Sequence, residues 1–136
     1  PGEDELDFTL PSLAKLEALL GRSLKARDLI TKEILLRNIE SSRARRWADS
    51  APAPRLVVGD FNTPKESRIF QEHWGDLTET FDQAGFGFGH SKYTRLFALR
   101  IDHILADEQW VVRAARILPD YGSDHRPMMA DLELRR

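Results

Sequence analysis

The chain has 136 residues, a formal net charge of −2 and no cysteine. This length suffices for one domain with a hydrophobic core, and the ordinary composition argues against a disordered chain. The charge argues against a strongly basic nucleic-acid surface, and the lack of cysteine excludes disulfides and thiolate chemistry. No apolar run is long enough to cross a bilayer, and the first residues lack a signal-peptide pattern.

The N-terminal third of the chain is predicted to be mainly helical. Residues 1–10 are acidic and favour a loop, and leucines at helical spacing predict a short helix over residues 11–20. A longer helix is predicted from about Ser23 to Asp49. Its apolar stripe is wide, so we expect it to pack on a sheet with covered flanks. The stripe comprises Leu29, Ile30, Ile34, Leu35, Leu36, Ile39 and Trp47.

A small basic cluster, Arg43, Arg45 and Arg46, lies near the end of this long helix. Such a cluster is either a solvated face that complements the helix dipole or a contact for a phosphate backbone, and the first situation is the more frequent. The proline-containing segment Ser50–Pro54 that follows predicts a stiff connector into the next element.

The stretch Leu56–Pro64 organises the rest of the chain. Its first three residues form a short apolar run typical of a buried strand, and Gly59 interrupts it. Asp60 and Asn62 follow at once, so a carboxylate and an amide lie at the carboxyl end of a strand, where ligands bind in α/β folds. The alternative is a local turn in which both side chains cap the backbone.

The remaining sequence mixes predicted helices and strands. Short helices are expected over residues 65–74 and 76–84, and strands over residues 100–106, 110–118 and 128–134. The glycine-rich segment Gly85–Gly89 lacks the Lys and Ser/Thr of a phosphate-cradling loop. We expect a mobile loop whose two phenylalanines pack onto the domain, with contact to a substrate as the alternative. Helices come first, followed by intermixed strands and helices, which indicates an α/β or α+β fold.

Polar residues recur at the ends of the predicted strands. Asp102 shares a strand face with Ile104, where an unpaired carboxylate would be costly, and His103 lies on the opposite face, outside any site that Asp102 joins. Asp124 and His125 immediately precede the last strand. The resulting set is Asp60, Asn62, Asp102, Asp124 and His125.

Carboxylates, an amide and an imidazole suit metal-assisted hydrolysis of a phosphoester. Carboxylate oxygens are the ligands that Mg²⁺ prefers, and a carboxylate bonded to an imidazole fixes its tautomer. A cationic imidazole and an amide can stabilise a phosphoryl group in transfer, and a further carboxylate can activate water. Each residue also has an ordinary structural explanation, such as a cap, a surface histidine or an ion pair. The residues alone therefore predict only a metal-assisted hydrolase.

Three segments resemble successive motifs of the endonuclease/exonuclease/phosphatase (EEP) family and occur in the family's order. They are Gly59-Asp60-Phe61-Asn62, Arg100-Ile101-Asp102-His103-Ile104 and Gly122-Ser123-Asp124-His125-Arg126-Pro127. The family includes apurinic-site endonucleases, pancreatic-type deoxyribonuclease, sphingomyelinases and inositol polyphosphate phosphatases. The resemblance runs from about Arg55 to Leu134 and implies the second half of a four-layer α/β/β/α sandwich. We expect one domain over residues 1–136, with a helical lead-in and connector (1–54) and an EEP-like catalytic portion (55–136).

The resemblance also implies a role for each polar residue. Asp60 would align and activate the attacking water, and Asn62 would donate a hydrogen bond to the scissile phosphate. Asp102 would hold His125 in orientation, and His125 would contact the phosphoryl oxygens. Asp124 would hold the metal, Mg²⁺ or alternatively Mn²⁺, directly or through water. The substrate implied is a phosphoester, whether nucleic acid, phospholipid head group or small molecule.

The first half of the family pattern, including its principal metal-binding Glu, has no counterpart before Arg55. The chain therefore resembles the second half of such an enzyme, with a missing N-terminal half as a partner, or a divergent short form. A half-sandwich would expose the inner face of its sheet. We expect weak metal binding and little or no hydrolysis by this chain alone. The alternative is a catalytically silent binding module that keeps the fold.

Overall fold

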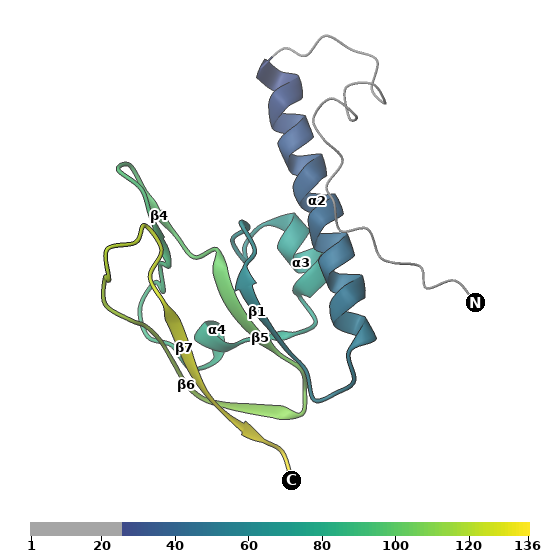
Figure 1. The fold of residues 1–136 in the computed structure, drawn as a ribbon, viewed down its shortest axis with the longest axis vertical. Coiled ribbons are helices and arrows are strands. Elements are labelled where there is room, and N and C mark those ends of the chain that lie inside the picture. Colours follow the sequence, from purple (N-terminus) through teal and green to yellow (C-terminus); the bar gives the residue numbers. More distant parts are fainter. Residues whose placement is uncertain (1–25) are drawn as a thin grey trace, which may run out of the picture.

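The computed structural model describes residues 26–136 (Figure 1). The loop expected over residues 1–10 and the helix expected over residues 11–20 lie outside this range. No described helix is long and apolar enough to span a membrane. The described elements, in order, are α2 (Ala26–Ser50), β1 (Leu56–Asp60), α3 (Arg68–Trp74), β2 (Thr78–Glu79), α4 (Thr80–Ala84), β3 (Lys92–Tyr93), β4 (Ala98–Leu99), β5 (Asp102–Ala106), β6 (Trp110–Ile117) and β7 (Met128–Leu134).

The strands form three small antiparallel sheets. β5 is the central strand of the first sheet and pairs with β1 on one side and with β2 on the other. β6 and β7 form a long hairpin with an irregularity between Val112 and Ala114, and β3 and β4 form a short one. In the β1–β5 pair, Asp60 lies directly opposite Asp102. This register places both carboxylates on the same face of the sheet.

One face of the β1–β5 pair carries the hydrophobic core. Phe70 and Trp74 of α3 pack with Leu105 of β5, and all three are buried. Val57 of β1 packs against this cluster from the same face, because alternate residues of a strand point the same way. Ser67 starts α3 by accepting the amide N–H of Phe70 on its hydroxyl at 3.1 Å.

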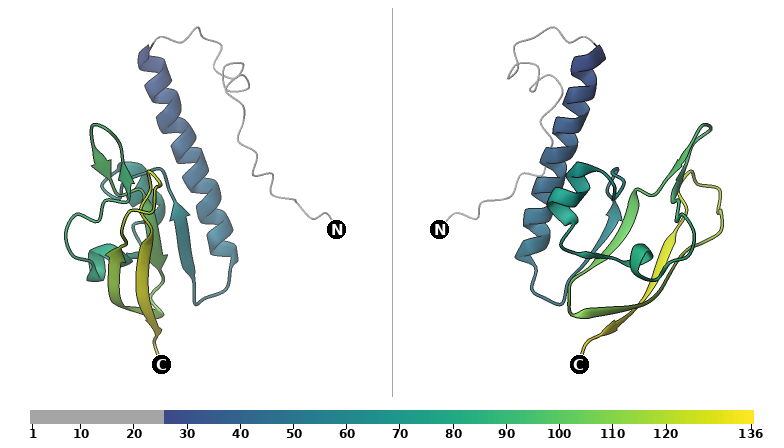
Figure 2. Two further views of the ribbon diagram at one scale, coloured as in Figure 1. Left: turned by 60° about the vertical axis from the view of Figure 1, so that its left-hand side comes forward. Right: turned by 180° about the vertical axis from the view of Figure 1, so that it is seen from behind.

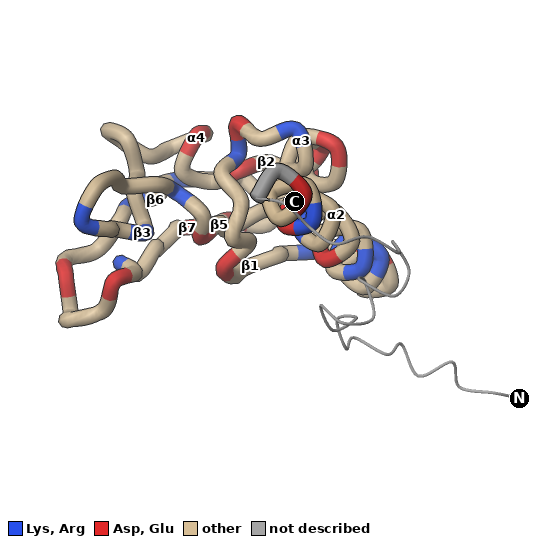
Figure 3. Tube along the Cα trace, turned by 90° about the horizontal axis from the view of Figure 1, so that it is seen from above, with Lys and Arg blue, Asp and Glu red and all other residues tan. Residues whose placement is uncertain are grey.

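The opposite face of the pair is open. Figure 3 shows α3 and α4 on one side of β1, β5 and β7, with no described element covering the other side. Val58 is 64% exposed and Leu56 is 41% exposed. The expectation that β1 is a buried strand is therefore correct for one face only, because neither α3 nor the β6–β7 hairpin covers the face that Val58 occupies.

The long helix α2 matches the predicted helix, but its apolar stripe is not covered as expected. Leu29, Ile30 and Ile34 are each more than half exposed, and so is Trp47. Figure 2 shows the reason, since the N-terminal end of α2 runs past the sheet and past α3. Among the described residues, only the C-terminal part of the helix meets the core, through Ala48.

Between residues 76 and 99 two local predictions were wrong and one element was missed. The helix expected over residues 76–84 is shorter, because Thr78 and Glu79 pair with β5 and the Glu79 carboxylate then caps α4. Phe86 and Phe88 do not pack onto the domain and are 99% and 84% exposed. The β3–β4 hairpin was not predicted, since two residues per strand are too few to show a periodic pattern.

Arg45, from the basic cluster of α2, is engaged in a structural ion pair. Its guanidinium donates hydrogen bonds to both carboxylate oxygens of Asp76, to the Asp49 carboxylate and to the His73 carbonyl. Hydrogen bonding to Arg45 holds the pKa of the Asp76 carboxyl below its usual value, despite partial desolvation. Arg45 therefore ties α2 to the segment after α3, which agrees with a structural reading of the cluster.

Asp76→Asn is expected to lower the free energy of unfolding at pH 7 by roughly 0.5 kcal/mol, because exposed ion pairs contribute little. A carboxylate with a lowered folded-state pKa stabilises the fold above its unfolded-state pKa of about 4, and this stabilisation disappears as the pH falls through the folded-state pKa. The wild-type chain and Asp76→Asn should therefore differ less at about pH 2 than at pH 7.

Urea denaturation at the two pH values measures this difference. Asp131→Asn is the matched control, since Asp131 is exposed and forms no ion pair among the described residues. An Asp76→Asn effect of equal size at both pH values would contradict the assignment of the pH dependence to this ion pair.

Candidate active site

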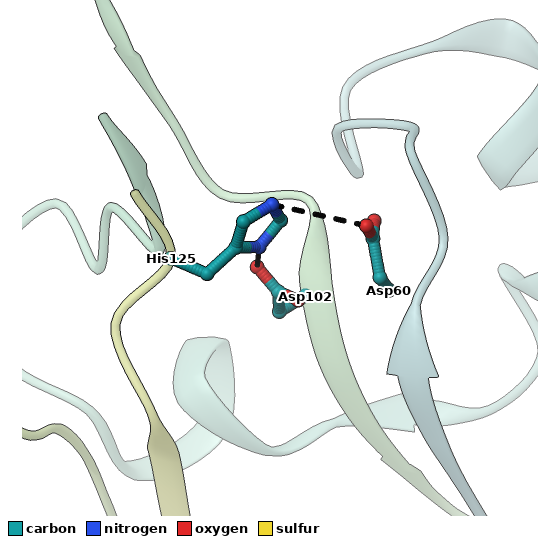
Figure 4. Close-up of side chains that lie close together, drawn as sticks. All are labelled: Asp60, Asp102 and His125. Atoms are coloured by element: carbon teal, nitrogen blue, oxygen red, sulfur yellow. Dashed lines mark hydrogen bonds and ion pairs between the residues drawn. The ribbon is translucent and has the colours of Figure 1, made fainter. Parts of the chain in front are cut away.

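Three side chains from separate segments meet at one end of the β1–β5 pair (Figure 4). Asp60 ends β1, Asp102 begins β5, and His125 lies on the loop before β7. The His125 Nδ1 atom lies 2.8 Å from the Asp102 Oδ2 atom, and the His125 Nε2 atom lies 3.9 Å from the Asp60 Oδ2 atom. The imidazole is therefore situated between two carboxylates, bonded to one and facing the other.

The Asp102 contact determines the tautomer of His125. A carboxylate can only accept a hydrogen bond, so Nδ1 of His125 must carry the proton in the 2.8 Å bond. The Nε2 atom then points toward Asp60. The side chains of Asp60, His125 and Asp102 are 39%, 28% and 22% exposed, so solvent and a ligand can reach all three.

The two carboxylate oxygens of Asp60 make different contacts, one within the local turn and one toward His125. Its Oδ1 atom accepts the N–H of Asn62 at 2.7 Å, which is the capping turn considered as the alternative for this stretch. Asn62 has a φ of 50°, a left-handed conformation that asparagine adopts more readily than most residues. Because Oδ1 holds the turn, Oδ2 is the Asp60 oxygen that faces His125.

The structure separates the other two predicted residues from this group. The Asp124 carboxylate contacts the Lys92 ammonium, which holds the pKa of Asp124 below its usual value, and the Asp124 side chain is 66% exposed. The Asn62 side chain lines the cavity between α2 and β1, whereas His125 lines a different cavity on the open face. Asp60 lines both cavities, as do Val58 and Gly59, and so lies between them.

His103 was predicted to lie outside the site, and its position confirms this. It is buried on the core face of β5, where its Nε2 atom lies 3.0 Å from the Thr63 carbonyl oxygen. Its ring packs against Phe61 and Phe70. The alternation of side chains along β5 thus assigns His103 to the core and Asp102 to the site.

The cavity that His125 lines has a volume of about 400 Å³ and is open to solvent. Val58, Ile104 and Met128 give it an apolar wall beside the polar group. Asp60, Asp102 and His125 each present a ligand atom within 4.8 Å of the others, an arrangement that can hold a metal ion. The oxygen donors suit a hard cation such as Mg²⁺. The two carboxylates offer the oxygen ligands that such a cation prefers, and the Nε2 atom of His125 faces the same group.

One known protein family matches more than half of the chain. The sequence model described as Endonuclease/Exonuclease/phosphatase family matches residues 34–125, and so begins within α2, upstream of Arg55. No curated protein sequence matches the chain.

Solved structures with the same fold share little sequence with the chain. An endonuclease/exonuclease/phosphatase from Bacteroides vulgatus is 23% identical with a TM-score of 0.60, over 74% of this chain and 44% of that one. A functionally unknown protein from Enterococcus faecalis V583 is 22% identical with a TM-score of 0.58, over 74% and 45%. A mannosyl-6-phosphatase from Bacteroides thetaiotaomicron VPI-5482 is 18% identical with a TM-score of 0.54, over 73% and 46%.

These likenesses confirm the predicted α/β fold. The chain spans less than half the length of each of these structures. The family match, by contrast, covers more than half of the chain and includes all of Asp60, Asn62, Asp102, Asp124 and His125. The chain belongs to the endonuclease/exonuclease/phosphatase family.

Proposed function

We propose that this chain carries catalytic residues of a metal-dependent phosphoesterase, as the C-terminal part of the enzyme. Membership of the family suggests hydrolysis of the phosphoester type, and the family includes nucleases and phosphatases. The observation that carries the proposal is the position of His125, bonded to Asp102 on one side and facing Asp60 on the other. A hydrogen-bonded imidazole between two partly exposed carboxylates is suited to proton transfer and charge stabilisation.

In this proposal the three residues have distinct tasks. Asp102 accepts the Nδ1 proton and fixes the ring of His125, so that an N–H at Nε2 can donate to a phosphoryl oxygen when the imidazole is cationic. Asp60 aligns the attacking water with its free Oδ2 atom and accepts its proton. Nε2 and Oδ2 lie 3.9 Å apart and both residues line the same open cavity, which supports a phosphoryl group bound beside the two.

The bound metal, Mg²⁺ or Mn²⁺, would lower the pKa of the attacking water and neutralise charge on the phosphoester. Asp60 and Asp102 are the residues that could hold it among the described group. Asp124 remains a proposed ligand, directly or through water, and would have to exchange its contact with Lys92 for the ion. Asn62 remains the proposed hydrogen-bond donor to the scissile phosphate, from the far side of Asp60.

The same residues could act on a phosphodiester or on a phosphomonoester. Nucleic acid, a phospholipid head group and a small phosphoester would all present the phosphoryl oxygens that His125 is proposed to contact. The open face beside Val58 supports the further proposal that an N-terminal half of the fold is the partner of this chain. Such a half would supply the metal-binding Glu of the family pattern.

The second candidate function is a binding module that keeps the fold without catalysis. The observation that favours it is the contact between Asp124 and Lys92, which occupies one expected metal ligand with an ammonium group. The two candidates differ in one property that does not depend on turnover. A catalytic centre is expected to bind a divalent cation at Asp60, whereas a catalytically silent module is not.

Binding of Mn²⁺ therefore tests the proposal directly. Mn²⁺ added to the ¹⁵N-labelled chain should broaden the amide signals near Asp60, Asp102 and His125 before others, because these residues offer converging ligand atoms. Binding should be weak, and Asp60→Asn should abolish the selective broadening, while Asp131→Asn leaves it intact. Broadening spread over all exposed carboxylates, or unaffected by Asp60→Asn, would favour the silent module.

A further inference from the structure

Ser91 is a fully buried residue that touches the start of strand β5. It is 0% exposed, and its hydroxyl oxygen accepts two backbone hydrogen bonds, from the N–H of Ile101 at 3.2 Å and from the N–H of Asp102 at 3.1 Å. The carbonyl of the same Ile101 accepts the N–H of Phe61, the residue after Asp60, at 2.8 Å. Ser91 thus holds the backbone at the point where Asp102 enters the sheet.

The backbone of Ser91 and its neighbours also holds the loop that carries His125. The Ser91 carbonyl accepts the N–H of Arg126 at 2.6 Å, and the N–H of Tyr93 donates to the Asp124 carbonyl at 2.9 Å. Lys92, between them, pairs with His125 in an antiparallel bridge. The residues on both sides of His125 are therefore bonded to the segment that begins at Ser91.

We propose that Ser91 is a positioning residue for the Asp102–His125 pair. Its hydroxyl fixes Asp102, and its carbonyl fixes the residue that follows His125, so one buried residue sets the 2.8 Å bond between the two side chains. It does not itself contact the cavity that the pair lines. The inference rests on the proposed function for its catalytic meaning, although the positioning can be measured without catalysis.

The hydroxyl is the part of Ser91 that a substitution can remove selectively. Ser91→Ala leaves two N–H groups without their acceptor in a position closed to solvent, so the start of β5 should shift to satisfy them. The bonds through the Ser91 carbonyl are backbone bonds and stay available in the variant, so the hairpin should remain attached to the His125 loop. Asp102 should then move relative to His125, and the ring should lose its fixed tautomer.

NMR of the ¹⁵N-histidine-labelled chain measures the tautomer of His125 without substrate or metal. In the neutral imidazole we expect the Nδ1-protonated tautomer alone in the wild type, a mixture of tautomers in Ser91→Ala, and the single tautomer again in Ser91→Thr, which keeps the hydroxyl. Thr80→Val is the matched control, because Thr80 is equally buried and its hydroxyl has no hydrogen-bond partner in the described part of the chain. It should leave His125 unchanged.

An unchanged tautomer in Ser91→Ala would overturn the inference, as would a tautomer mixture in the wild type or the same change in Thr80→Val. If the chain hydrolyses an aryl phosphodiester, Ser91→Ala should also lower kcat by about 10- to 100-fold with little change in KM, as expected for a displaced catalytic group. Absence of selective Mn²⁺ binding at Asp60 together with the expected tautomer change would refute the proposed function and leave the positioning role in place.

Discussion

His125→Ala is expected to reduce hydrolysis of a phosphoester by at least about 100-fold, to the background rate, because general acid–base and charge-stabilising groups contribute factors of about 10² to 10⁴. The structural reason is that His125 is the group that links Asp102 to Asp60. The measurement is cleavage of an aryl phosphodiester and of a plasmid by the 136-residue chain with Mg²⁺ or Mn²⁺. We expect the wild-type rate itself to be low.

His90→Ala is the matched control for this substitution. His90 contacts the rings of Phe88 and Tyr93 and takes no part in the Asp60–Asp102–His125 group. A rate that survives in His90→Ala and disappears in His125→Ala would support the catalytic assignment. Equal rates above background in the wild type and His125→Ala would refute it. A folded wild type with neither hydrolysis nor selective Mn²⁺ binding would favour the silent module.

Leu105→Ala is expected to lower the free energy of unfolding by about 3 kcal/mol, the usual cost of replacing a buried leucine by alanine. Leu105 is 0% exposed and packs with Phe70 and Trp74, so the deleted atoms leave a cavity at the junction of β5 and α3. Because α3 is held to the sheet by this same cluster, little of the loss can be recovered by relaxation. Urea denaturation followed by tryptophan fluorescence measures it, since Trp74 lies in the cluster.

Leu96→Ala provides the control for the core substitution. Leu96 lies between β3 and β4 and is 88% exposed, so its removal should change the free energy of unfolding by less than about 0.5 kcal/mol. The same loss in both variants would mean that Leu105 is not part of the core that stabilises the chain. A loss in Leu105→Ala alone confirms the packing of β5 on α3.

Local sequence patterns were sufficient to predict the longer helices and strands. The long helix ending near Asp49, the strand after Leu56, the strand ending at Ala106 and the strand Met128–Leu134 all appear close to their expected bounds. β2 could not be predicted because its partner β5 is distant in the sequence, and the β3–β4 hairpin could not because two residues per strand show no periodic pattern. The burial of the α2 stripe was overestimated for the same reason, since periodicity shows which residues share a face but not what covers it.

The amino-acid sequence by itself determined the α/β class, the three motifs of the family and the separation of Asp102 from His103 on opposite faces of one strand. These features depend on residue order and on the two-residue period of a strand. Only the tertiary structure decided that Asp60 lies opposite Asp102 and that Asp124 contacts Lys92 instead of joining the group, whereas the bond between His125 and Asp102 is the pairing that the resemblance implied. Strand register and loop placement are set by the packing of distant segments, and no local pattern encodes them.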